Sequence, residues 1–516
     1  MDHSGQHGAT GGDSGGRGTG ARAAIAGLVP AGVLAVCTVV ILRFWPDMGR
    51  AAGDEINFHE PAIRRFYDQW PAFDFSDYLS ATTPGYHLLM AAVMKVMGPW
   101  EVFMRATGAL IGCLLVGVLG AACAVRSGSA RVGMLLALPL AASMYVQDST
   151  AHLLPDNLGW LGVLAMVLIA GRMARGREGW RVLVPLAGVV LAALVFARQI
   201  HVWTAALAWG AAWMAAAGPE RAGENLRDAV FDRPKPRFTA ATIAGLATLP
   251  ALLELVWFAR LWNGLTPPSV AAQYPGANPA APAFILSLVG VASLFYIAWL
   301  VRPIAEVWRR ARWAIALAAG VGLAAALIPE TTYSLKEGRY SGLWAVAMPQ
   351  AGLIAFGRTS VVLAVLAPLG AVALVGWAWR LGPRPGTLLL GGAAAFIAAQ
   401  AASYMLYQRY SEPAVLMTVA LCAAAPMAGS RREATEQRWV GRTAALGPLV
   451  LATGLATITF MSLRRETAPH PYFGFEPGGE AIRLFFNERA SEVQAVERPP
   501  RQVYPPWWPW GEEGGR

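Results

Sequence analysis

Long apolar runs alternate with short polar segments from residue 23 to residue 463. Most of the runs are close to the ~20 residues that a helix needs to cross a bilayer. We therefore predict an all-α, polytopic transmembrane protein with about 11 to 13 spans. The predicted spans cover residues 23–43, 103–125, 132–147, 153–171, 182–200, 202–218, 239–261, 282–301, 313–328, 360–379, 387–405, 412–428 and 443–463.

Two places depart from this pattern. The run Pro84–Gly98 is short for a span and contains His87 and Lys95, so it is expected to lie on or partly in the membrane, with a short span as the alternative. The spacing of Ile63, Phe66 and Tyr67 predicts another short interfacial helix within residues 61–69. Both helices fall in a long first loop, residues 46–99.

Composition supports a membrane protein, because 55% of the residues are hydrophobic and only 14% are charged. The net charge of +10 comes mainly from arginines in alternate loops, one of them residues 302–312, which favours a cytosolic location for those loops and for the N-terminus. It does not indicate nucleic-acid binding. Residues 1–22 are predicted to be a disordered cytosolic leader, and residues 464–516 an extracytoplasmic tail rich in Pro and Trp.

Several kinds of site are not expected. The four cysteines (Cys37, Cys113, Cys123 and Cys422) lie in apolar runs and are predicted to be core residues. The histidines are scattered, so no metal site is predicted. No glycine-rich phosphate loop is found on the cytosolic side, which argues against a soluble nucleotide sugar as donor.

The adjacent carboxylates Asp54 and Glu55 are the leading candidates for chemistry. They follow the first span closely, and ionisable groups at a membrane are costly unless they have a function. A carboxylate can take a proton from a sugar hydroxyl, and cations can hold a departing phosphate. The other polar residues expected on the same side include His59, Lys95, Arg105, Asp148, Asp156, Arg198, Lys336, Arg339 and Arg409.

Arg198 and His201 interrupt the apolar stretch of residues 182–217 at the point where the chain must turn. An arginine at that depth needs a partner, and the sequence leaves two open, a lipid phosphate or an outer acid such as Asp156. Lys95, Arg198 and Arg339 are predicted to bind the phosphate of a lipid-linked donor.

Six short segments, in order, resemble motifs of the α-1,2-glucosyltransferase family that uses dolichyl-phosphoglucose and adds the terminal glucose to the lipid-linked oligosaccharide. The resemblance covers about residues 50–415. The first segment needs one inserted residue, Asn57, relative to D-E-x-F-H-x-P. The segments are DEINFHEP (54–61), TTPGYHLL (82–89), FARQIHVW (196–203), WNG (262–264), EGRY (337–340) and QRYSEP (408–413).

The resemblance implies a GT-C fold with its active site in the first outer loop and, in general, an inverting reaction that needs no metal or other cofactor. The donor would be a polyprenyl-phosphate sugar, glucose being the best guess, and the acceptor an extracytoplasmic glycan or a lipid-linked one. Asp54 matches the family's first-loop acid, with Glu55 beside it. The residues expected to bind substrate are His59, Asp156, Gln199, Trp262, Asn263, Tyr340 and Arg409.

A transporter or flippase for a lipid-linked anionic substrate is the alternative. Such a protein would place ionisable groups near mid-membrane and often contains inverted repeats. Here the charges gather on one side of the membrane and no internal repeat is found, which favours the enzyme. The Arg-, Ala- and Gly-rich composition suggests the plasma membrane of a bacterium.

Overall fold

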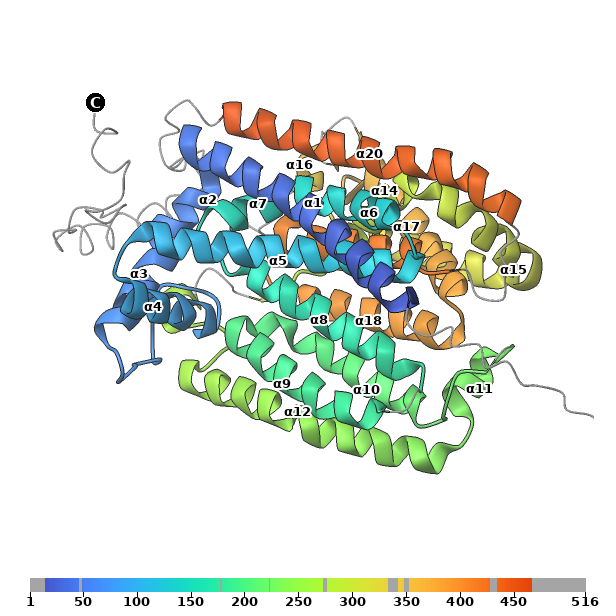
Figure 1. Cartoon of the computed structure of the whole chain (residues 1–516), viewed down its shortest axis with the longest axis horizontal. Coiled ribbons are helices and arrows are strands. Elements are labelled where there is room, and N and C mark those ends of the chain that lie inside the picture. The colour runs from blue at the N-terminus through green and yellow to red at the C-terminus, as the bar shows by residue number, and fades with distance from the viewer. Residues whose placement is uncertain are drawn as a thin grey trace, which may run out of the picture.

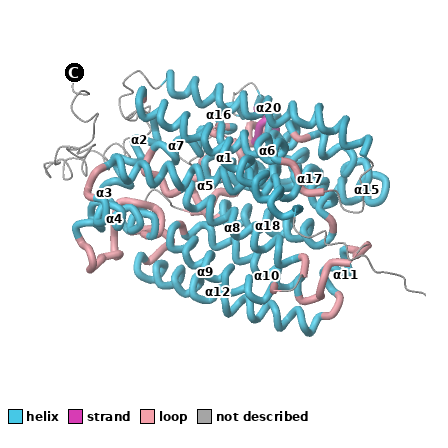
Figure 2. Tube along the Cα trace, viewed as in Figure 1, coloured by secondary structure: helices cyan, strands magenta, loops and turns pink. Residues whose placement is uncertain are grey.

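The computed structural model describes residues 14–45, 49–176, 179–221, 223–271, 276–332, 342–347, 352–426 and 434–465. These residues form a helical bundle, which confirms the predicted all-α polytopic fold (Figures 1 and 2). Within the described residues, eight helices are long and apolar enough to cross a membrane. They are α1 (Ser14–Phe44), α5 (Glu101–Ser127), α8 (Asp156–Ala174), α9 (Trp180–Ala197), α12 (Pro234–Trp262), α15 (Ile297–Leu327), α17 (Val361–Leu381) and α20 (Ala434–Arg465).

A bent pair of helices forms a ninth candidate span, with an angle of 72° between its two members. The other predicted spans fall on helices that are shorter or less apolar, so the count by length and composition is below 11 to 13. The bent pair is α6 (Ala130–Ala142) and α7 (Met144–Ala151), and the helices at the other predicted spans are α10 (Ala205–Ala215), α14 (Ala281–Phe295), α18 (Pro383–Ala401) and α19 (Glu412–Ala424).

Short elements join these helices, and the first loop contains several of them. Residues 60–68 and 85–97 form the two short helices expected there. The short elements are α2 (Gly49–Asp54), the π-helical turn η1 (Glu55–His59), α3 (Glu60–Asp68), α4 (Gly85–Met97), the 3₁₀ turn η2 (Gln199–Thr204), α11 (Leu226–Phe231), α13 (Pro268–Ala271), α16 (Leu343–Ala347), β1 (Leu353–Ile354), β2 (Thr359–Ser360) and the 3₁₀ turn η4 (Gln408–Tyr410). The two strands pair antiparallel, Leu353 opposite Ser360.

Two boundaries differ from the sequence-based expectation. The segment 302–312, expected to be a basic loop, is helical and belongs to α15, because its Ala, Arg, Glu and Trp residues are compatible with a helix. Likewise, α1 begins at Ser14, so the first helix starts earlier than residue 23. The rest of the predicted leader, residues 1–13, and residues 466–516 of the predicted tail lie outside the described residues.

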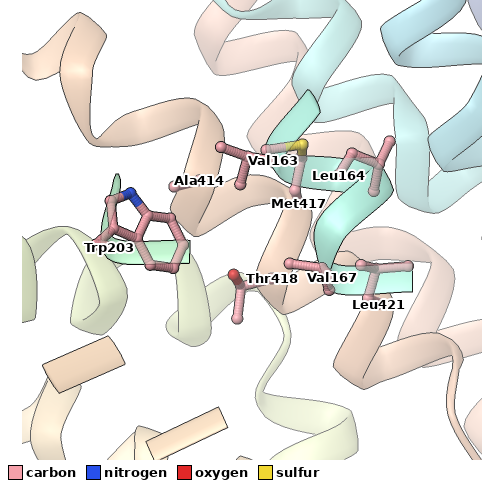
Figure 3. A pocket seen from close by; sticks show the side chains of 8 residues that line it. All are labelled: Val163, Leu164, Val167, Trp203, Ala414, Met417, Thr418 and Leu421. Carbon is pink, nitrogen blue, oxygen red and sulfur yellow. The ribbon is translucent and has the colours of Figure 1, made fainter. Parts of the chain in front are cut away.

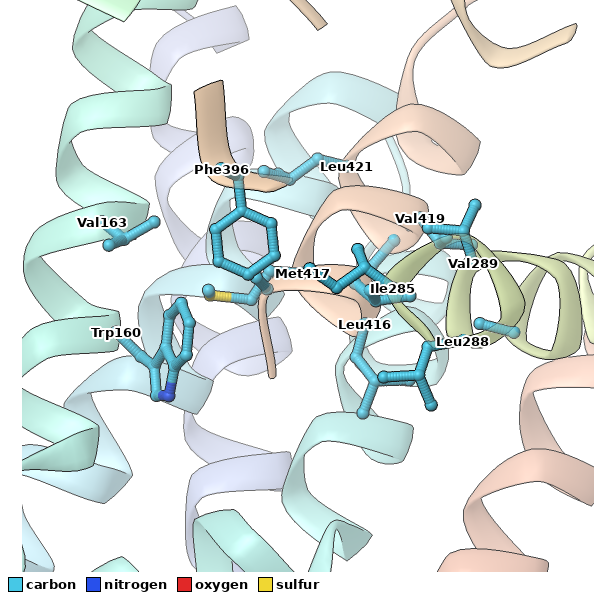
Figure 4. Packing of buried hydrophobic residues seen from close by; sticks show 14 of the residues in the cluster. Trp160, Val163, Ile285, Leu288, Val289, Phe396, Leu416, Met417, Val419 and Leu421 are labelled. Atoms are coloured by element: carbon cyan, nitrogen blue, oxygen red, sulfur yellow. The ribbon is translucent and has the colours of Figure 1, made fainter. Parts of the chain in front are cut away.

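Helix packing uses small residues where two helices approach closely. A Cβ on Gly27 of α1 would lie 2.6 Å from the backbone oxygen of Gly117 on α5, and one on Gly120 would lie 2.2 Å from the oxygen of Ala26. Close backbone approach of this kind is typical of membrane helices. Trp160, Phe396 and Met417 belong to the large central core, which joins α8, α18 and α19 (Figure 4).

The interior beside this core leaves little space. A cavity of about 30 Å³ between α8, η2 and α19 has room for about one water molecule. Val163, Trp203 and Met417 are among its lining residues, which are nearly all apolar (Figure 3). This cavity is too small and too apolar to hold a sugar or a phosphate.

The two ends of the bundle carry different residues. Asp54, Arg105 and Asp156 lie where α2 ends and where α5 and α8 begin. The opposite ends of α5 and α8 carry Arg126 and Arg172. In Figure 1, α2, α3 and α4 lie at one end of the molecule and α11 and α15 at the other. The acidic candidate residues and the basic helix ends are therefore separated along the bundle.

Candidate functional site

A π-helical turn positions the acid pair. The backbone N–H of Glu60 donates to the carbonyl oxygen of Glu55, five residues earlier, so this turn contains one residue more than an α-helical turn. Asn57, the residue inserted relative to the family motif, lies in the middle of it. Its side-chain amide donates to the carbonyl of Gly53 at 2.9 Å. The turn thus absorbs the extra residue without breaking the helical path from α2 to α3.

Asp54 forms an ion pair with an arginine from the distant end of the chain. Arg409 Nη1, in the 3₁₀ turn η4, donates to Asp54 Oδ2 at 2.5 Å. The side chains of Asp54 and Arg409 are 27% and 21% exposed, so solvent or a ligand can reach the pair. The guanidinium also lies over the rings of Tyr407 and Tyr410, at 4.9 and 5.0 Å from their centroids.

Glu55 lies in a closed network. Its side chain has no exposed surface, and each carboxylate oxygen has a partner. Arg105 Nη2 donates to Oε1 at 3.1 Å, and His152 Nδ1 lies 3.0 Å from Oε2. Arg105 also pairs with Glu101, one turn earlier on α5, at 2.5 Å. Glu55 therefore joins the first loop to α5 and to the segment before α8, and its buried carboxylate is inaccessible to a substrate.

A second buried ion pair joins α8 to the end of α9. Arg198 Nη1 donates to Asp156 Oδ1, and both side chains are almost fully buried. Arg198 is the extended residue between α9 and η2, so the chain turns at the point that the sequence predicts. Its guanidinium lies 4.4 Å from the centroid of the Tyr410 ring. The two arginines, each paired with an aspartate, therefore meet at one tyrosine.

Two histidines connect the acid-bearing turn to α4. His59 Nδ1 lies 3.0 Å from His87 Nε2, and both side chains are buried. Burial is the largest influence on His59 and, with the charges of Arg409 and Arg198 opposed by Asp156, it lowers the pKa of His59 to about 3. Burial also holds the pKa of His87 well below its usual range, so both imidazoles are neutral near pH 7 and one ring nitrogen donates to the other.

His201, in the turn η2, is also held neutral. Burial and the nearby Arg198 guanidinium lower the pKa of this imidazole to about 3, although Asp156 opposes the shift. The ring packs edge-on against Trp160, with the two centroids 5.1 Å apart. A Cβ on Gly159 would lie 2.5 Å from His201 Nε2, so this glycine leaves the space that the imidazole occupies.

We expect the melting temperature of the purified protein to fall as the pH is lowered from 7.5 to 5. His59 and His201 have folded-state pKa values of about 3, whereas an unperturbed histidine titrates near 6.5. The unfolded chain therefore binds more protons below pH 6.5, and stability is lost progressively from there toward pH 3. Thermal unfolding of the double variant His59→Gln/His201→Gln should show a shallower pH dependence. Parallel curves for the two proteins would contradict this explanation.

Three predicted substrate-binding residues lie near this cluster. Two of them form hydrogen bonds to its loops, and the third lies in a loop. Gln199 accepts from the backbone N–H of Thr83 at 3.0 Å and donates to the carbonyls of Ala81 and Leu265 at 2.8 Å. Trp262 donates from Nε1 to the carbonyl of Phe75 at 2.8 Å. Asn263 is exposed and ends α12 in a left-handed conformation. For Gln199 and Trp262, these contacts indicate a positioning role in assembling the loops.

Of the three predicted phosphate-binding residues, one lies in the cluster, one lies on α4 and one lies outside the described residues. Arg198 lies in the cluster, but it is paired with Asp156. Lys95 is exposed on α4, and its ammonium lies 3.9 Å from the centroid of the Tyr67 ring. Arg339 and Tyr340 lie outside the described residues, as does the whole EGRY segment. A phosphate-binding role for Lys95 and for Arg339 therefore stays a prediction.

The contributors to the cluster that were not assigned from the sequence include His87, His152 and Tyr410. His87 and Tyr410 lie within the segments TTPGYHLL and QRYSEP, and His152 lies four residues before Asp156. Their positions beside the motifs were the available signal. Within the described residues, no group of three or more His, Cys, Asp or Glu side chains is arranged to hold a metal ion.

The fold and the site define a helical membrane protein with a partly open Asp–Arg pair and a buried charged network at one end of its bundle. No protein-family model matches the sequence, and no curated protein matches it. Among solved structures, the chain is similar to the archaeal oligosaccharyltransferase AglB from Archaeoglobus fulgidus, described in complex with an inhibitory peptide and a dolichol-phosphate. The identity is 12% and the TM-score 0.37, with 92% of this chain and 60% of that chain covered. At these values the similarity assigns no function.

Proposed function

We propose that this protein is an integral-membrane glycosyltransferase of the GT-C type. It transfers a hexose, with glucose as the proposed sugar, from a polyprenyl-phosphate donor to an extracytoplasmic glycan or lipid-linked acceptor. The reaction inverts the configuration of the anomeric carbon and needs no metal or other cofactor. The active site is the end of the bundle that contains Asp54 and Arg409.

One observation carries this proposal. Five of the six motif segments are described. Four of them, although far apart in the sequence, contact one another directly around the cluster that contains Asp54 and Arg409. The fifth, WNG, is followed at once by Leu265, whose carbonyl accepts from Gln199. The contacts join Asp54 to Arg409, His59 to His87, Thr83 to Gln199, Gln199 to Leu265 and Arg198 to Tyr410. Motif matches that arose by chance would not be expected to converge on one place.

The geometry favours Asp54 over Glu55 as the base. Both oxygens of Glu55 are occupied and its side chain is inaccessible, whereas Asp54 is partly exposed and is shown with a single ion-pair partner. A general base must come within hydrogen-bond reach of the proton that it takes. Glu55 then acts as a positioning residue, which fixes the turn carrying Asp54.

The accessible guanidinium of Arg409 is the best candidate for the donor phosphate. Arg198 is more deeply buried and already neutralised by Asp156. Phosphate binding to Arg409 would displace Asp54, because both are anions that compete for the same N–H groups. Donor binding would thus release the carboxylate that the reaction needs.

The transfer step then follows. The acceptor hydroxyl attacks the anomeric carbon, its proton passes to Asp54, and the bond from the anomeric carbon to the phosphate oxygen breaks. The polyprenyl monophosphate leaves with the bonding electron pair, and Arg409 stabilises its charge. In a flippase, by contrast, this bond would remain intact.

The transfer is tested with purified protein in detergent. A panel of radiolabelled polyprenyl-monophosphate hexoses is incubated with cell-envelope glycans, and release of polyprenyl monophosphate is followed by chromatography. Donor-dependent labelling of a glycan supports the proposal. If no donor labelled a glycan, and the intact lipid-linked sugar moved across the membrane of proteoliposomes that contain the protein, the transporter alternative would be established.

The proposed orientation places the first loop outside the cell. With the four native cysteines replaced by serine, Asp74→Cys should react with a membrane-impermeant maleimide in intact cells. Arg227→Cys, at the opposite end of the bundle, should react only after the cells are permeabilised. Both positions are exposed in the structure, so access to the reagent decides the outcome. Labelling of both sites in intact cells would overturn the orientation.

A further inference from the structure

The first half of α15, residues 297–310, has the charge pattern of an interfacial helix. Its apolar side chains recur every three or four residues on one face, and several are well exposed. These are Ile297, Val301, Ile304, Ala305 and Trp308. The intervening positions carry Arg302, Glu306, Arg309 and Arg310. A basic polar face opposite an apolar face containing Trp is typical of helices that lie at the membrane surface.

A break in the helix separates this half from the membrane-spanning half. Ala311 has non-helical dihedral angles, φ −151° and ψ 52°. The chain beyond Arg312 is free of charge from Trp313 to Pro329. A straight helix of 31 residues would measure about 46 Å, whereas the hydrocarbon core is about 30 Å thick. The excess of roughly 11 residues falls within the charged segment before Ala311.

A groove of about 470 Å³ runs along this segment and continues past the break. Its lining is apolar except for Arg309, and it includes Ile315 on the far side of Ala311. In Figure 1 this part of α15 lies at the opposite end of the molecule from α3 and α4. The groove is therefore separate from the site that contains Asp54 and Arg409.

Three of the four arginines of this segment form no ion pair within the described part of the chain. Glu306 lies 3.4 Å from Arg302 Nε and accepts from Trp379 Nε1 at 3.2 Å, so the acid of this segment is engaged. Arg309, Arg310 and Arg312 are exposed, and none forms an ion pair with a described carboxylate. One guanidinium that lines an apolar groove, with two more within three positions along the chain, fits a ligand with a phosphate and an acyl chain.

We propose that residues 297–315 of α15 bind an anionic glycerophospholipid. One acyl chain lies in the groove formed by Val301, Ile304 and Trp308, and the phosphate lies against Arg309, with Arg310 and Arg312 nearby. The break at Ala311 places the groove and the guanidiniums at the depth where acyl chains meet headgroups. This site does not depend on the transferase proposal, since it uses none of the same residues.

The test compares lipid retention by native mass spectrometry of the full-length protein, titrated with equal amounts of phosphatidylglycerol and phosphatidylcholine. Wild-type protein should retain phosphatidylglycerol preferentially. The variant Arg309→Gln/Arg310→Gln/Arg312→Gln should lose roughly tenfold in this preference, because basic side chains near the membrane surface attract anionic lipid. A matched control, Arg172→Gln/Arg175→Gln/Arg227→Gln, removes three exposed charges away from the groove and should keep the preference.

A second variant separates the groove from net charge. Ala305→Phe fills the groove without changing charge and should reduce the retained phosphatidylglycerol while leaving the arginines in place. Equal retention of the two phospholipids by wild-type protein would overturn the proposal. So would an equal loss in the two triple variants, which would indicate diffuse attraction. Preferential displacement of bound phosphatidylglycerol by polyprenyl monophosphate would also overturn it, by identifying the groove as a donor site.

Discussion

Asp54→Asn is expected to lower the rate of sugar transfer by a factor on the order of 10² to 10⁴. Asparagine keeps the size of the side chain but cannot accept the proton of the acceptor hydroxyl. The loss should appear in kcat, measured as polyprenyl monophosphate released from a labelled donor. Donor affinity should stay the same or rise, because Arg409 no longer has a competing carboxylate at 2.5 Å.

Two control variants distinguish the proposed base, Asp54, from the other acids of the first loop. Asp74→Asn removes an exposed acid of the same loop, one that pairs with Arg65, and should leave the rate unchanged. Glu55→Gln removes a charge from the closed network, so its main effect should be on stability. Wild-type turnover in Asp54→Asn would eliminate this carboxylate as the base, and loss of turnover in Glu55→Gln at unchanged stability would transfer the role to Glu55.

Asp156→Ala is expected to destabilise the folded protein by about 3–5 kcal/mol, the usual effect of removing one partner of a buried ion pair. The Arg198 guanidinium would remain buried with no carboxylate to neutralise it, since both side chains are almost inaccessible. Chemical unfolding in detergent measures this loss. Protein yield and melting temperature should fall together.

The companion variants test whether the pair, and not either residue alone, is responsible. Asp156→Ala/Arg198→Met removes both charges and should recover part of the loss, because no uncompensated charge remains buried. Arg65→Ala breaks the exposed pair with Asp74 and should have little effect. If Arg198→Met left stability intact and weakened donor binding instead, Arg198 would be a phosphate ligand and the structural role would be wrong.

The sequence predicts the membrane architecture well where hydrophobic runs are long and uninterrupted. It also predicts the turn at Arg198, because this arginine interrupts an apolar stretch that is too long for one span. A charged side chain at that depth needs a partner. The expected loop at residues 302–312 is wrong, since a basic segment can be an interfacial helix as well as a loop, and hydropathy does not distinguish the two. The break at Ala311 has no Gly or Pro to mark it.

The candidate site could be predicted only in part. The sequence places Asp54, Asp156, Arg198 and Arg409 among a larger set of polar residues on one side of the membrane. Which acid pairs with which arginine depends on helix packing across the whole chain, and the Asp54–Arg409 contact joins residues 355 positions apart. The closed network around Glu55 depends equally on distant residues, so the sequence left the two adjacent acids equivalent.

The most direct test of the central claim is the binding of polyprenyl monophosphate, the product shared by all such donors whatever sugar they carry. A titration of purified wild-type protein should show saturable binding, which Arg409→Gln weakens at least about tenfold because it loses a charge-assisted phosphate contact. Asp54→Asn should bind as well as wild type or more tightly. Absence of binding by wild-type protein, or equal affinity in Arg409→Gln, would contradict an active site built on Asp54 and Arg409.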